Sequence, residues 1–219
     1  MTAALAPLVQ DLAAAGLRLA GGLHAGPGDT AHVGTAATIL LVAPDEARFW
    51  PVFSAAPEAG DGLPDPLDRW SHRVIGTIAA AHGAGACFPF DDPAPPFIRW
   101  ALATGRVHSS PVGLLVDRAA GLWFSLRGAL LLKKRVPLPS PTPSPCADCT
   151  ARPCLPACPA GALSGAGHDV ARCHEWLDRD EGRPCLSGGC RVRAACPFSR
   201  ASGRPEAQAA FHMRAFHPP

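Results

Sequence analysis

The chain has 219 residues, of which 47% are hydrophobic, and its formal net charge is only +2. This length suffices for one sizeable core, or for one medium domain followed by a small one. The low charge argues against a general binder of polyanions, and no apolar stretch is long enough to span a membrane.

The first half of the chain carries alternating signals for helices and strands. Apolar spacing and turn residues predict helices over residues 2–20, 44–53, 66–81 and 95–104, and buried strands over 38–42 and 86–90. Asp65 is expected to cap the third helix, with Pro66 in its first turn. Cys87, inside the second strand, is interpreted as a small buried residue.

A hairpin is predicted after these elements. Residues 112–116 and 122–132 are apolar runs on either side of the turn residues 117–121, which is typical of paired strands. Together with the preceding helices and strands, the hairpin predicts an α+β fold, with layers of helix and sheet, over residues 1–135.

The chain changes character after residue 135. Residues 136–145 alternate proline with small residues and predict a stiff, extended connector. A second domain is expected at 146–200, where large apolar residues are few and a metal would supply the stability that burial cannot. The tail, residues 201–219, has little to pack and is expected to be loosely held.

Eight of the nine cysteines lie in the last third of the chain, in two sets of four that each end in Cys-Pro. This order resembles the run that holds iron–sulfur clusters in bacterial two-cluster ferredoxins, where the fourth thiolate of each run binds the other cluster. We therefore expect one [4Fe–4S] cluster on Cys146, Cys149, Cys154 and Cys196. The other is expected on Cys158, Cys173, Cys185 and Cys190.

The thiols allow other interpretations. Cysteine pairs at short spacing also bind zinc, and the gap after Cys149 is longer than in the common ferredoxin run. His168 and His174 lie among the cysteines and either serve as further ligands or face solvent. Disulfides are disfavoured, because the first residues lack a signal peptide and so predict a cytoplasmic protein, whose thiols stay reduced.

Motifs in the first domain resemble a known family. The segment Phe88-Pro-Phe-Asp-Asp92-Pro-Ala-Pro95, then Arg99, then Gly121-Leu-Trp-Phe124, is similar to epoxyqueuosine reductases, in which such motifs precede the same ferredoxin module. The stretch from Gly121 to Gly128 is also similar to the cobalamin-processing protein, a decyanase and dealkylase. Both relatives bind a corrinoid, so the resemblance implies a nitroreductase-like mixed sheet domain that binds cobalamin, followed by a small bacterial dicluster ferredoxin-like domain.

The resemblance also implies roles for individual residues. Asp92 matches the proposed proton donor of the reductases, although an aspartate before proline also serves as a helix cap. The residues implied at the corrinoid are Arg99, Gly121, Trp123, Phe124 and Arg127. Plainer interpretations exist, since Trp123 and Phe124 suit an ordinary strand and the two arginines suit solvent.

These observations favour a cytoplasmic iron–sulfur oxidoreductase that passes electrons from two [4Fe–4S] clusters to a bound cobalamin, for reductive processing of the corrinoid. Lys133, Lys134 and Arg135 either dock an acidic electron donor, such as a flavodoxin or a ferredoxin reductase, or are simply solvated. One alternative is a compact epoxyqueuosine reductase acting on tRNA, which the low positive charge disfavours. The other is an electron carrier whose first domain binds no cofactor.

Overall fold

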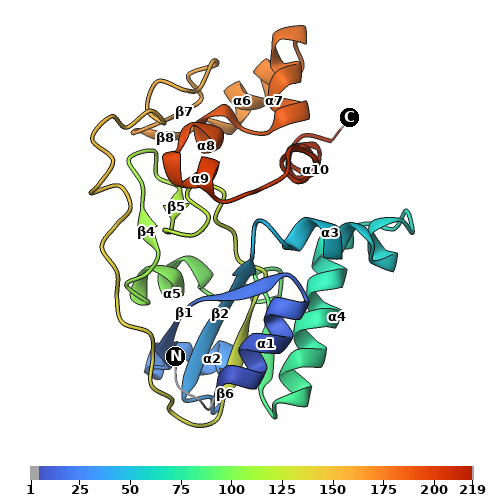
Figure 1. Cartoon of the computed structure of the whole chain (residues 1–219), viewed down its shortest axis with the longest axis vertical. Helices are drawn as coiled ribbons and strands as arrows, with labels where there is room; N and C mark the ends of the chain where they lie inside the picture. The colour runs from blue at the N-terminus through green and yellow to red at the C-terminus, as the bar shows by residue number, and fades with distance from the viewer. Residues whose placement is uncertain (1–4, 219) are drawn as a thin grey trace. The chain divides into compact units, whose positions relative to one another are not determined.

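The computed structural model describes residues 5–218, and the chain divides into two compact units (Figure 1). The sheet unit comprises the chain up to Val107 together with Ser125–Thr142. The thiol unit comprises His108–Phe124 together with the chain from Pro143 onward. This division differs from the predicted one, because residues 108–124, expected in the first domain, cluster with the cysteines.

The sheet unit is built on four antiparallel strands in the order β1-β2-β6-β3. Their bounds are β1 Leu17–His24, β2 Thr38–Pro44, β3 Gly85–Cys87 and β6 Gly128–Leu132. β2 is buried along its whole length, as its continuous apolar run predicts. The mixed α+β class is confirmed, as are both predicted strands, the second of them shorter than expected.

Helices cover this sheet. Those described in the sheet unit are α1 Ala6–Ala14, α2 Thr30–Val33, α3 Phe49–Ser54, α4 Pro66–Ala81 and α5 Phe97–Ala103, with 3-10 turns at Pro27–Asp29 and Pro57–Ala59. α1 and α4 pack on each other and on the sheet, whereas α5 packs against β1 (Figure 1). Phe49 and Phe53 of α3 both meet the Trp70 ring edge to face, which fixes α3 against α4.

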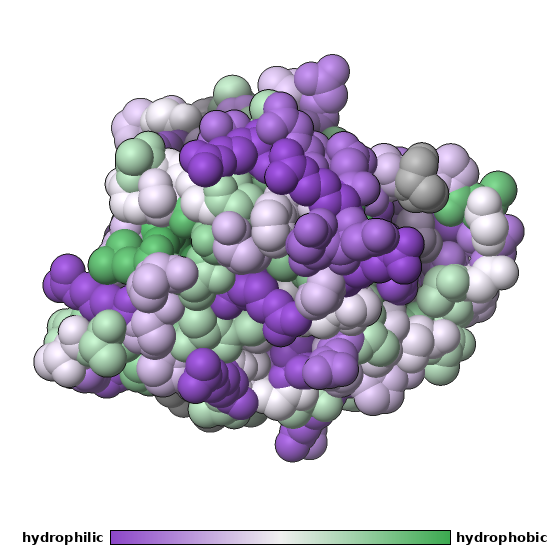
Figure 2. Space-filling model, turned by 90° about the horizontal axis from the view of Figure 1, so that it is seen from above, coloured by the Kyte–Doolittle hydropathy of each residue, from purple (hydrophilic) through white to green (hydrophobic). Residues whose placement is uncertain are grey.

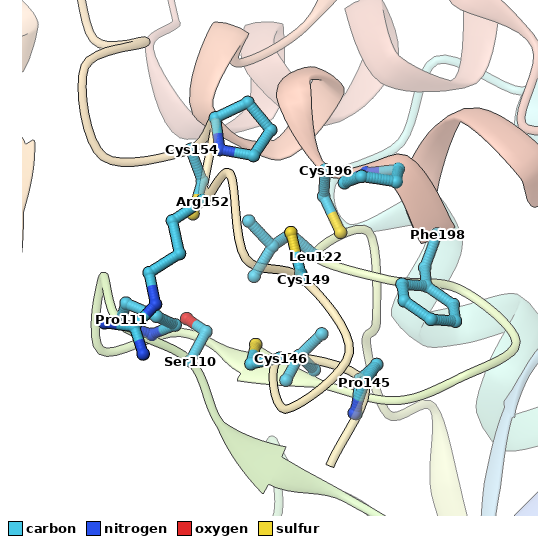
Figure 3. A pocket seen from close by; sticks show the side chains of 13 residues that line it. Ser110, Pro111, Leu122, Pro145, Cys146, Cys149, Arg152, Cys154, Cys196 and Phe198 are labelled. Atoms are coloured by element: carbon cyan, nitrogen blue, oxygen red, sulfur yellow. The ribbon is translucent and has the colours of Figure 1, made fainter.

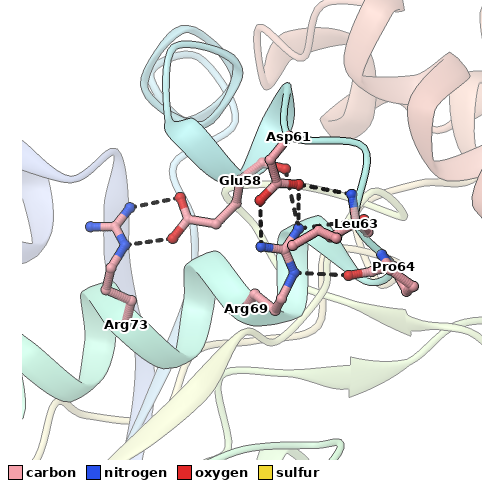
Figure 4. Close-up of polar contacts among 6 residues, drawn as sticks. All are labelled: Glu58, Asp61, Leu63, Pro64, Arg69 and Arg73. Atoms are coloured by element: carbon pink, nitrogen blue, oxygen red, sulfur yellow. Dashed lines mark hydrogen bonds and ion pairs between the residues drawn. The ribbon is translucent and has the colours of Figure 1, made fainter.

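Arginine–carboxylate pairs hold the loop before α4 against that helix (Figure 4). Arg73 donates to the Glu58 carboxylate through two nitrogens, and Arg69 grips Asp61 in the same two-pronged way at 2.7 Å. Paired hydrogen bonds of this kind fix orientation as well as distance. The proline- and glycine-rich loop is therefore anchored to the helix at two points.

The first predicted helix is wrong beyond residue 14. α1 ends at Ala14, and Leu19 lies in β1 instead. The chain turns at Gly16, whose φ of +70° suits glycine and where a Cβ would lie 2.8 Å from the Phe49 Cα. A short helix followed by a buried strand produces apolar spacing that resembles one longer helix. Residues 2–4 of that prediction lie outside the described part of the chain.

Asp65 does not cap α4 in the predicted manner. The helix begins at Pro66 as expected, but Asp65 has a left-handed backbone with φ of 50° and its side chain makes no capping hydrogen bond. The first turn instead gains contacts from the neighbouring loop, where Arg69 donates to the Pro64 carbonyl oxygen at 2.8 Å.

The predicted hairpin of residues 112–116 with 122–132 is also wrong. Its second run contributes β6, which lies between β2 and β3, with Leu130 opposite Leu40 and Ala129 opposite Cys87. Its first run contains β5 Leu115–Val116, which pairs with β4 His108–Ser109 in a separate small hairpin. Because a buried strand pairs on both sides, local apolarity alone does not identify its partners.

The thiol unit consists of short elements around a small core. After β4 and β5 come β7 Leu163–Ser164, β8 Gly167–His168, α6 Val170–Leu177, a 3-10 turn Asp180–Gly182, α7 Arg183–Gly188, α8 Arg191–Ala195, α9 Pro197–Ala201 and α10 Glu206–Phe216. The core cluster contains Val112, Val116, Leu122, Cys154, Leu163, Val192 and Cys196. Two cysteines thus stand among the most buried residues of this unit.

The connector is anchored to the sheet unit by hydrogen bonds, and the tail is more ordered than the sequence predicts. Residues 136–142 have no regular secondary structure, but Arg106 donates to the Ser140 carbonyl oxygen and the Thr142 N–H donates to that of Gly105. The tail forms α10, which packs on α7 and buries Ala209 and Ala210. The prediction of a loosely held tail is therefore wrong, whereas the absence of helix and strand over residues 136–142 agrees with an extended connector.

No helix in residues 5–218 is long and apolar enough to cross a membrane. On the face drawn in Figure 2, hydrophilic side chains predominate and hydrophobic ones form small groups rather than one broad patch. Scattered hydrophobic residues of this kind are ordinary on a protein surface.

Candidate metal centre

The four cysteines of the first predicted set line one pocket of the thiol unit. Cys146, Cys149 and Cys154 come from the turns that follow the connector, and Cys196 comes from the junction of α8 and α9. Figure 3 shows their sulfur atoms turned toward a common space. The other residues that line the pocket are Ser110, Pro111, Val116, Leu122, Pro145, Arg152, Pro153, Pro197 and Phe198.

Local backbone structure presents these sulfurs. Cys196 is the residue before α9, and Pro197 occupies the first turn, where its missing N–H leaves no hydrogen bond unmade. In the turns, the Cys149 N–H donates to the Cys146 carbonyl oxygen, and the Cys146 N–H donates to the Ser144 Oγ at 3.2 Å. The proline after Cys196 and the turn between Cys146 and Cys149 thus fix the backbone from which these thiols project.

The thiols of this set raise one another's pKa values through electrostatic repulsion between their charged forms. Burial raises the pKa of Cys146, and the neighbouring thiols of Cys196, Cys154 and Cys149 raise it further, against the lowering effect of a hydrogen bond with Ser144. Burial likewise raises the pKa of Cys154, with the Cys196 and Cys149 thiols adding to the rise. Four sulfurs close enough to repel one another as thiolates form a donor set that a cationic group would stabilise.

The second predicted set comes together in the same unit. Burial raises the pKa of Cys173 to about 11, with contributions from the thiols of Cys190, Cys158 and Cys185. Cys185 is buried, and its pKa is also raised by burial and by the Cys190 and Cys158 thiols. The Cys158 Sγ accepts a hydrogen bond of 3.2 Å from the Ala162 N–H. The Cys173 and Cys185 thiols are thus each affected by neighbouring thiols of the second predicted set.

All eight predicted ligands are cysteines, and thiolate sulfur is the donor that iron–sulfur clusters use. In residues 5–218 there is no group of three or more His, Cys, Asp or Glu side chains that could hold a metal ion. A [4Fe–4S] cluster makes a different demand, since each of its four thiolates binds a different iron atom. All-sulfur donors, burial and an N–H···S hydrogen bond are features that such clusters use.

The sequence interpretation missed Ser110 and Arg152, which both line the first pocket. Arg152 lies in the longer gap between Cys149 and Cys154 and has an unusual φ of 42°. The extra length of that gap was a signal that additional residues surround the site. Ser110 carried no such signal, because it comes from the segment that the sequence assigned to the first domain.

The proposed acid and the arginine that follows it lie in the sheet unit. Asp92 is exposed and does not cap α5, since the residue before that helix is Pro96. Arg99 forms an ion pair with buried Asp29, which also accepts a 2.7 Å hydrogen bond from the Trp100 indole. Burial opposes ionisation of Asp29, but hydrogen bonds from the Gly26 N–H, Trp100 and Arg99 lower its pKa. The interpretation of Asp92 as a helix cap is therefore wrong, whereas Arg99 lies at the surface, as its plain interpretation predicts, and also pairs with Asp29.

Gly121 and Trp123 have structural contacts within the thiol unit. Gly121 has φ of +59°, and a Cβ there would lie 2.3 Å from the Ser199 backbone nitrogen. The guanidinium of Arg204 stacks 5.0 Å from the Trp123 ring centroid and donates to the Trp123 carbonyl oxygen. Phe124 is buried, and neither aromatic residue belongs to a strand, so their interpretation as strand residues is wrong.

Arg127 belongs to the sheet unit and donates to Asp68 of α4 at 2.9 Å. Burial lowers its pKa, although Asp68 opposes that shift. The interpretation of Arg127 as a solvated residue is wrong. The implied corrinoid residues thus divide between the two units, and several of them have partners within their own unit.

The histidines among the cysteines differ from each other. His168 is exposed, as one of the sequence interpretations predicts. His174 is half-buried, stacks on Phe216 with ring centroids 4.7 Å apart, and shares a hydrogen bond with His217. The Lys133 and Lys134 side chains are exposed, and Arg135 contacts the His24 ring at 2.7 Å.

One solved structure similar to this chain is that of epoxyqueuosine reductase from Streptococcus thermophilus, with a TM-score of 0.54 and 17% sequence identity. The similarity covers 87% of this chain and 63% of the other, so the chain spans less than two thirds of that enzyme. No protein-family model and no curated protein sequence matches the chain. At this identity the comparison supports a shared fold, which agrees with the resemblance inferred from the motifs.

Proposed function

We propose that this protein is an iron–sulfur oxidoreductase that holds two [4Fe–4S] clusters and transfers electrons to a bound cobalamin, for reductive processing of the corrinoid. The observation that carries the proposal is the pocket that Cys146, Cys149, Cys154 and Cys196 line together, with the other four predicted ligands in the same compact unit. Such clusters supply one-electron reduction when they are bound. The similarity in fold to epoxyqueuosine reductase supports the same class of protein.

The cysteines, rather than the corrinoid residues, give this proposal its support. Cys146, Cys149, Cys154 and Cys196 would hold one cluster, and the remaining four would hold the other. Cobalamin is proposed from the resemblance alone, because Arg99, Trp123 and Arg127 have partners within their own units. An exposed position leaves Asp92 accessible to a substrate, which is compatible with the role of proton donor.

Anaerobic purification tests the core of the proposal. We expect brown protein with about eight iron and eight acid-labile sulfide atoms per chain, as two cubane clusters require. Colourless protein that contains zinc instead would contradict the proposal. Titration of the reduced protein with cob(II)alamin then tests the acceptor, since a spectral shift is expected only if the corrinoid binds.

Asp92→Asn tests the acid in the reaction itself. The substitution removes the ionisable proton while it preserves the size of the side chain, so turnover should fall by about 100-fold if Asp92 donates a proton. Cluster content and cobalamin affinity should stay unchanged. Arg99→Gln serves as a comparison, because it is expected to change corrinoid binding rather than the rate of the bound complex.

A compact epoxyqueuosine reductase acting on tRNA is the second candidate, and the similarity in fold favours it. The two candidates differ in their requirement for nucleic acid. Binding of tRNA that weakens steeply with salt would support the second candidate. Reduction of added corrinoid without any tRNA binding would support the first.

A further inference from the structure

Ser110 has a buried hydroxyl group without a partner beside the first thiol set. Its residue is 7% exposed, and its Oγ has no hydrogen-bond partner among the described residues. Nearly all buried hydroxyl groups in proteins are paired, because an unpaired one has lost its water without compensation. A buried hydroxyl that lines a pocket therefore indicates a partner that occupies the pocket.

The pocket itself limits what this partner can be. Apart from Ser110, its polar side chains are Arg152 and the thiols of Cys146, Cys149, Cys154 and Cys196. A guanidinium only donates hydrogen bonds, so it offers no acceptor for the Ser110 O–H. None of these side chains accepts a hydrogen bond from the Ser110 Oγ, so the acceptor is a group that enters the pocket. Figure 3 shows the Ser110 oxygen on the side of the pocket near Arg152 and Cys146.

The backbone around Ser110 holds the hydroxyl in this place. The Ser110 N–H donates to the Leu114 carbonyl oxygen at 2.9 Å, and the Gly113 N–H donates to the Ser110 carbonyl oxygen at 3.0 Å. Val112 and Val116 then pack in the same core cluster as Cys154 and Cys196. Only rotation of the side chain remains free, so the group that occupies the pocket sets the direction of the O–H.

We propose that the Ser110 hydroxyl donates a hydrogen bond to a sulfur atom of the cluster held by the first thiol set, and that this bond raises the reduction potential of that cluster. The inference rests on the proposed function, since it needs the cluster to be present. Reduction adds one electron to the cluster, and a donor directed at sulfur stabilises the added negative charge. Ser110 is therefore a positioning and tuning residue that reaches the centre from outside the cysteine-rich segment.

Redox titration of the whole protein tests this inference. Wild type, Ser110→Ala and Ser110→Thr are titrated with dithionite, and the two clusters are followed by electron paramagnetic resonance. In Ser110→Ala we expect one cluster to become harder to reduce, with about a tenfold lower reduced-to-oxidised ratio at a fixed potential, or about 59 mV for one electron. The threonine variant keeps the hydroxyl and should retain the wild-type value.

A second readout identifies the proton. In the reduced wild type, one signal from an exchangeable proton coupled to a cluster should disappear in D₂O, and it should be missing in Ser110→Ala. Ser125→Ala is the matched control, because the Ser125 Oγ is also buried and unpartnered among the described residues but lies in the sheet unit. It should leave both potentials unchanged.

The outcomes separate this inference from the proposed function. Wild-type protein without iron and sulfide would overturn the proposed function itself. Two intact clusters whose potentials and proton couplings are the same in Ser110→Ala would overturn only the role of Ser110. Loss of one cluster in Ser110→Ala, with both retained in Ser110→Thr, would support contact between the hydroxyl and the cluster.

Discussion

The two compact units differ in what holds them together. Among the described residues, the largest fully buried side chains lie almost entirely in the sheet unit and include Trp70, Trp100 and Phe49. Leu122 is the one member of this set that belongs to the thiol unit. The thiol unit instead buries Cys154, Cys185 and Cys196. A unit with many short elements and few large apolar residues needs another source of stability, which a bound metal cluster would provide.

The two units thus differ in how much of their stability the packing of large apolar side chains supplies. The sheet unit has a central strand covered on both sides and needs no added group to bury its apolar surface. In the thiol unit, burial and neighbouring thiols raise the pKa of Cys146 and Cys173, so these thiols would lose their protons on binding a metal, and the energy of metal binding would contribute to folding. Removal of a bound metal should therefore destabilise the thiol unit alone, and truncation of a core side chain in the sheet unit should destabilise that unit alone.

Removal of iron should have the largest effect on stability, and this effect should be confined to the thiol unit. After oxidation and chelation, or in Cys185→Ala, we expect amides in α6, α7 and α8 to exchange more than about 100-fold faster, because the energy of metal binding contributes to folding. Amides in β2 and β6 should keep their protection. Hydrogen exchange read by mass spectrometry measures both.

Cys87→Ala is the control for this prediction. Cys87 lies in β3, where burial raises the pKa of its thiol to about 12, which is typical of an inert structural cysteine. The variant should retain all iron and cost only about 1 kcal/mol from the lost sulfur contacts. Equal loss of protection in both units after iron removal would show that the sheet unit also depends on metal.

Truncation of the largest core side chain should produce the reverse pattern. Trp70 is 1% exposed and contacts the rings of Phe49 and Phe53. Trp70→Ala should destabilise the sheet unit by about 3–5 kcal/mol, since a large cavity remains. Iron content and the cluster spectrum should not change. Loss of iron in this variant would contradict the separation between the two units.

The sequence predicts best where one local pattern decides the structure. α4 and β2 follow from spacing and from runs of similar residues, and four of the paired cysteines line one pocket. Asp65 was expected to cap α4, but the loop anchored by Arg69 supplies contacts of its own, and the aspartate adopts a left-handed backbone instead. Such competition between local and tertiary contacts is invisible in the local pattern.

The segment 108–124 shows what the sequence leaves open. Its apolar runs predict strands, yet Gly121 is packed against Ser199 and the Leu122 carbonyl oxygen accepts from Arg193, both far along the chain. These contacts place the segment, and with it Ser110, in the thiol unit. Contacts between residues about 70 positions apart cannot be recognised from the local sequence pattern. For this reason the sequence predicts neither the boundary between the units nor the proposed role of Ser110.

Gly121→Ala tests how this segment is attached to the thiol unit. The new Cβ would meet the Ser199 backbone, and its φ of +59° is unfavourable for alanine. We expect a loss of about 2–4 kcal/mol in the thiol unit, from strain and overpacking together. Chemical unfolding followed by cluster absorption measures this loss.

Gly113→Ala separates the effect of backbone strain from that of overpacking. Gly113 lies in the same segment with a φ of +75°, but a Cβ there would meet nothing within 4 Å. Its substitution should cost only about 1 kcal/mol, from the backbone conformation alone. Equal losses in the two variants would mean that the contact with Ser199 contributes nothing.

The smallest predicted effect is a dependence on pH within the sheet unit. Hydrogen bonds from Arg73 lower the pKa of Glu58 to about 2, although burial opposes its ionisation (Figure 4). The folded pKa lies below the unfolded one, near 4.3. The stabilisation is therefore complete above about pH 5 and is lost as the pH falls toward 2. Since Arg73 is half-exposed, solvent screening limits the effect to about 1 kcal/mol.

Glu58→Gln should remove this dependence. At pH 7 the variant should be less stable than wild type by about 1 kcal/mol, and the difference should shrink toward zero near pH 2. Acid damage to clusters would confuse a global measurement, so exchange of β2 amides at each pH is the suitable readout. Asp61→Asn provides the comparison, because the Asp61–Arg69 pair is more open to solvent than Glu58. A difference for Glu58→Gln that stays constant from pH 7 to pH 2 would show that the charge of this carboxylate does not stabilise the fold.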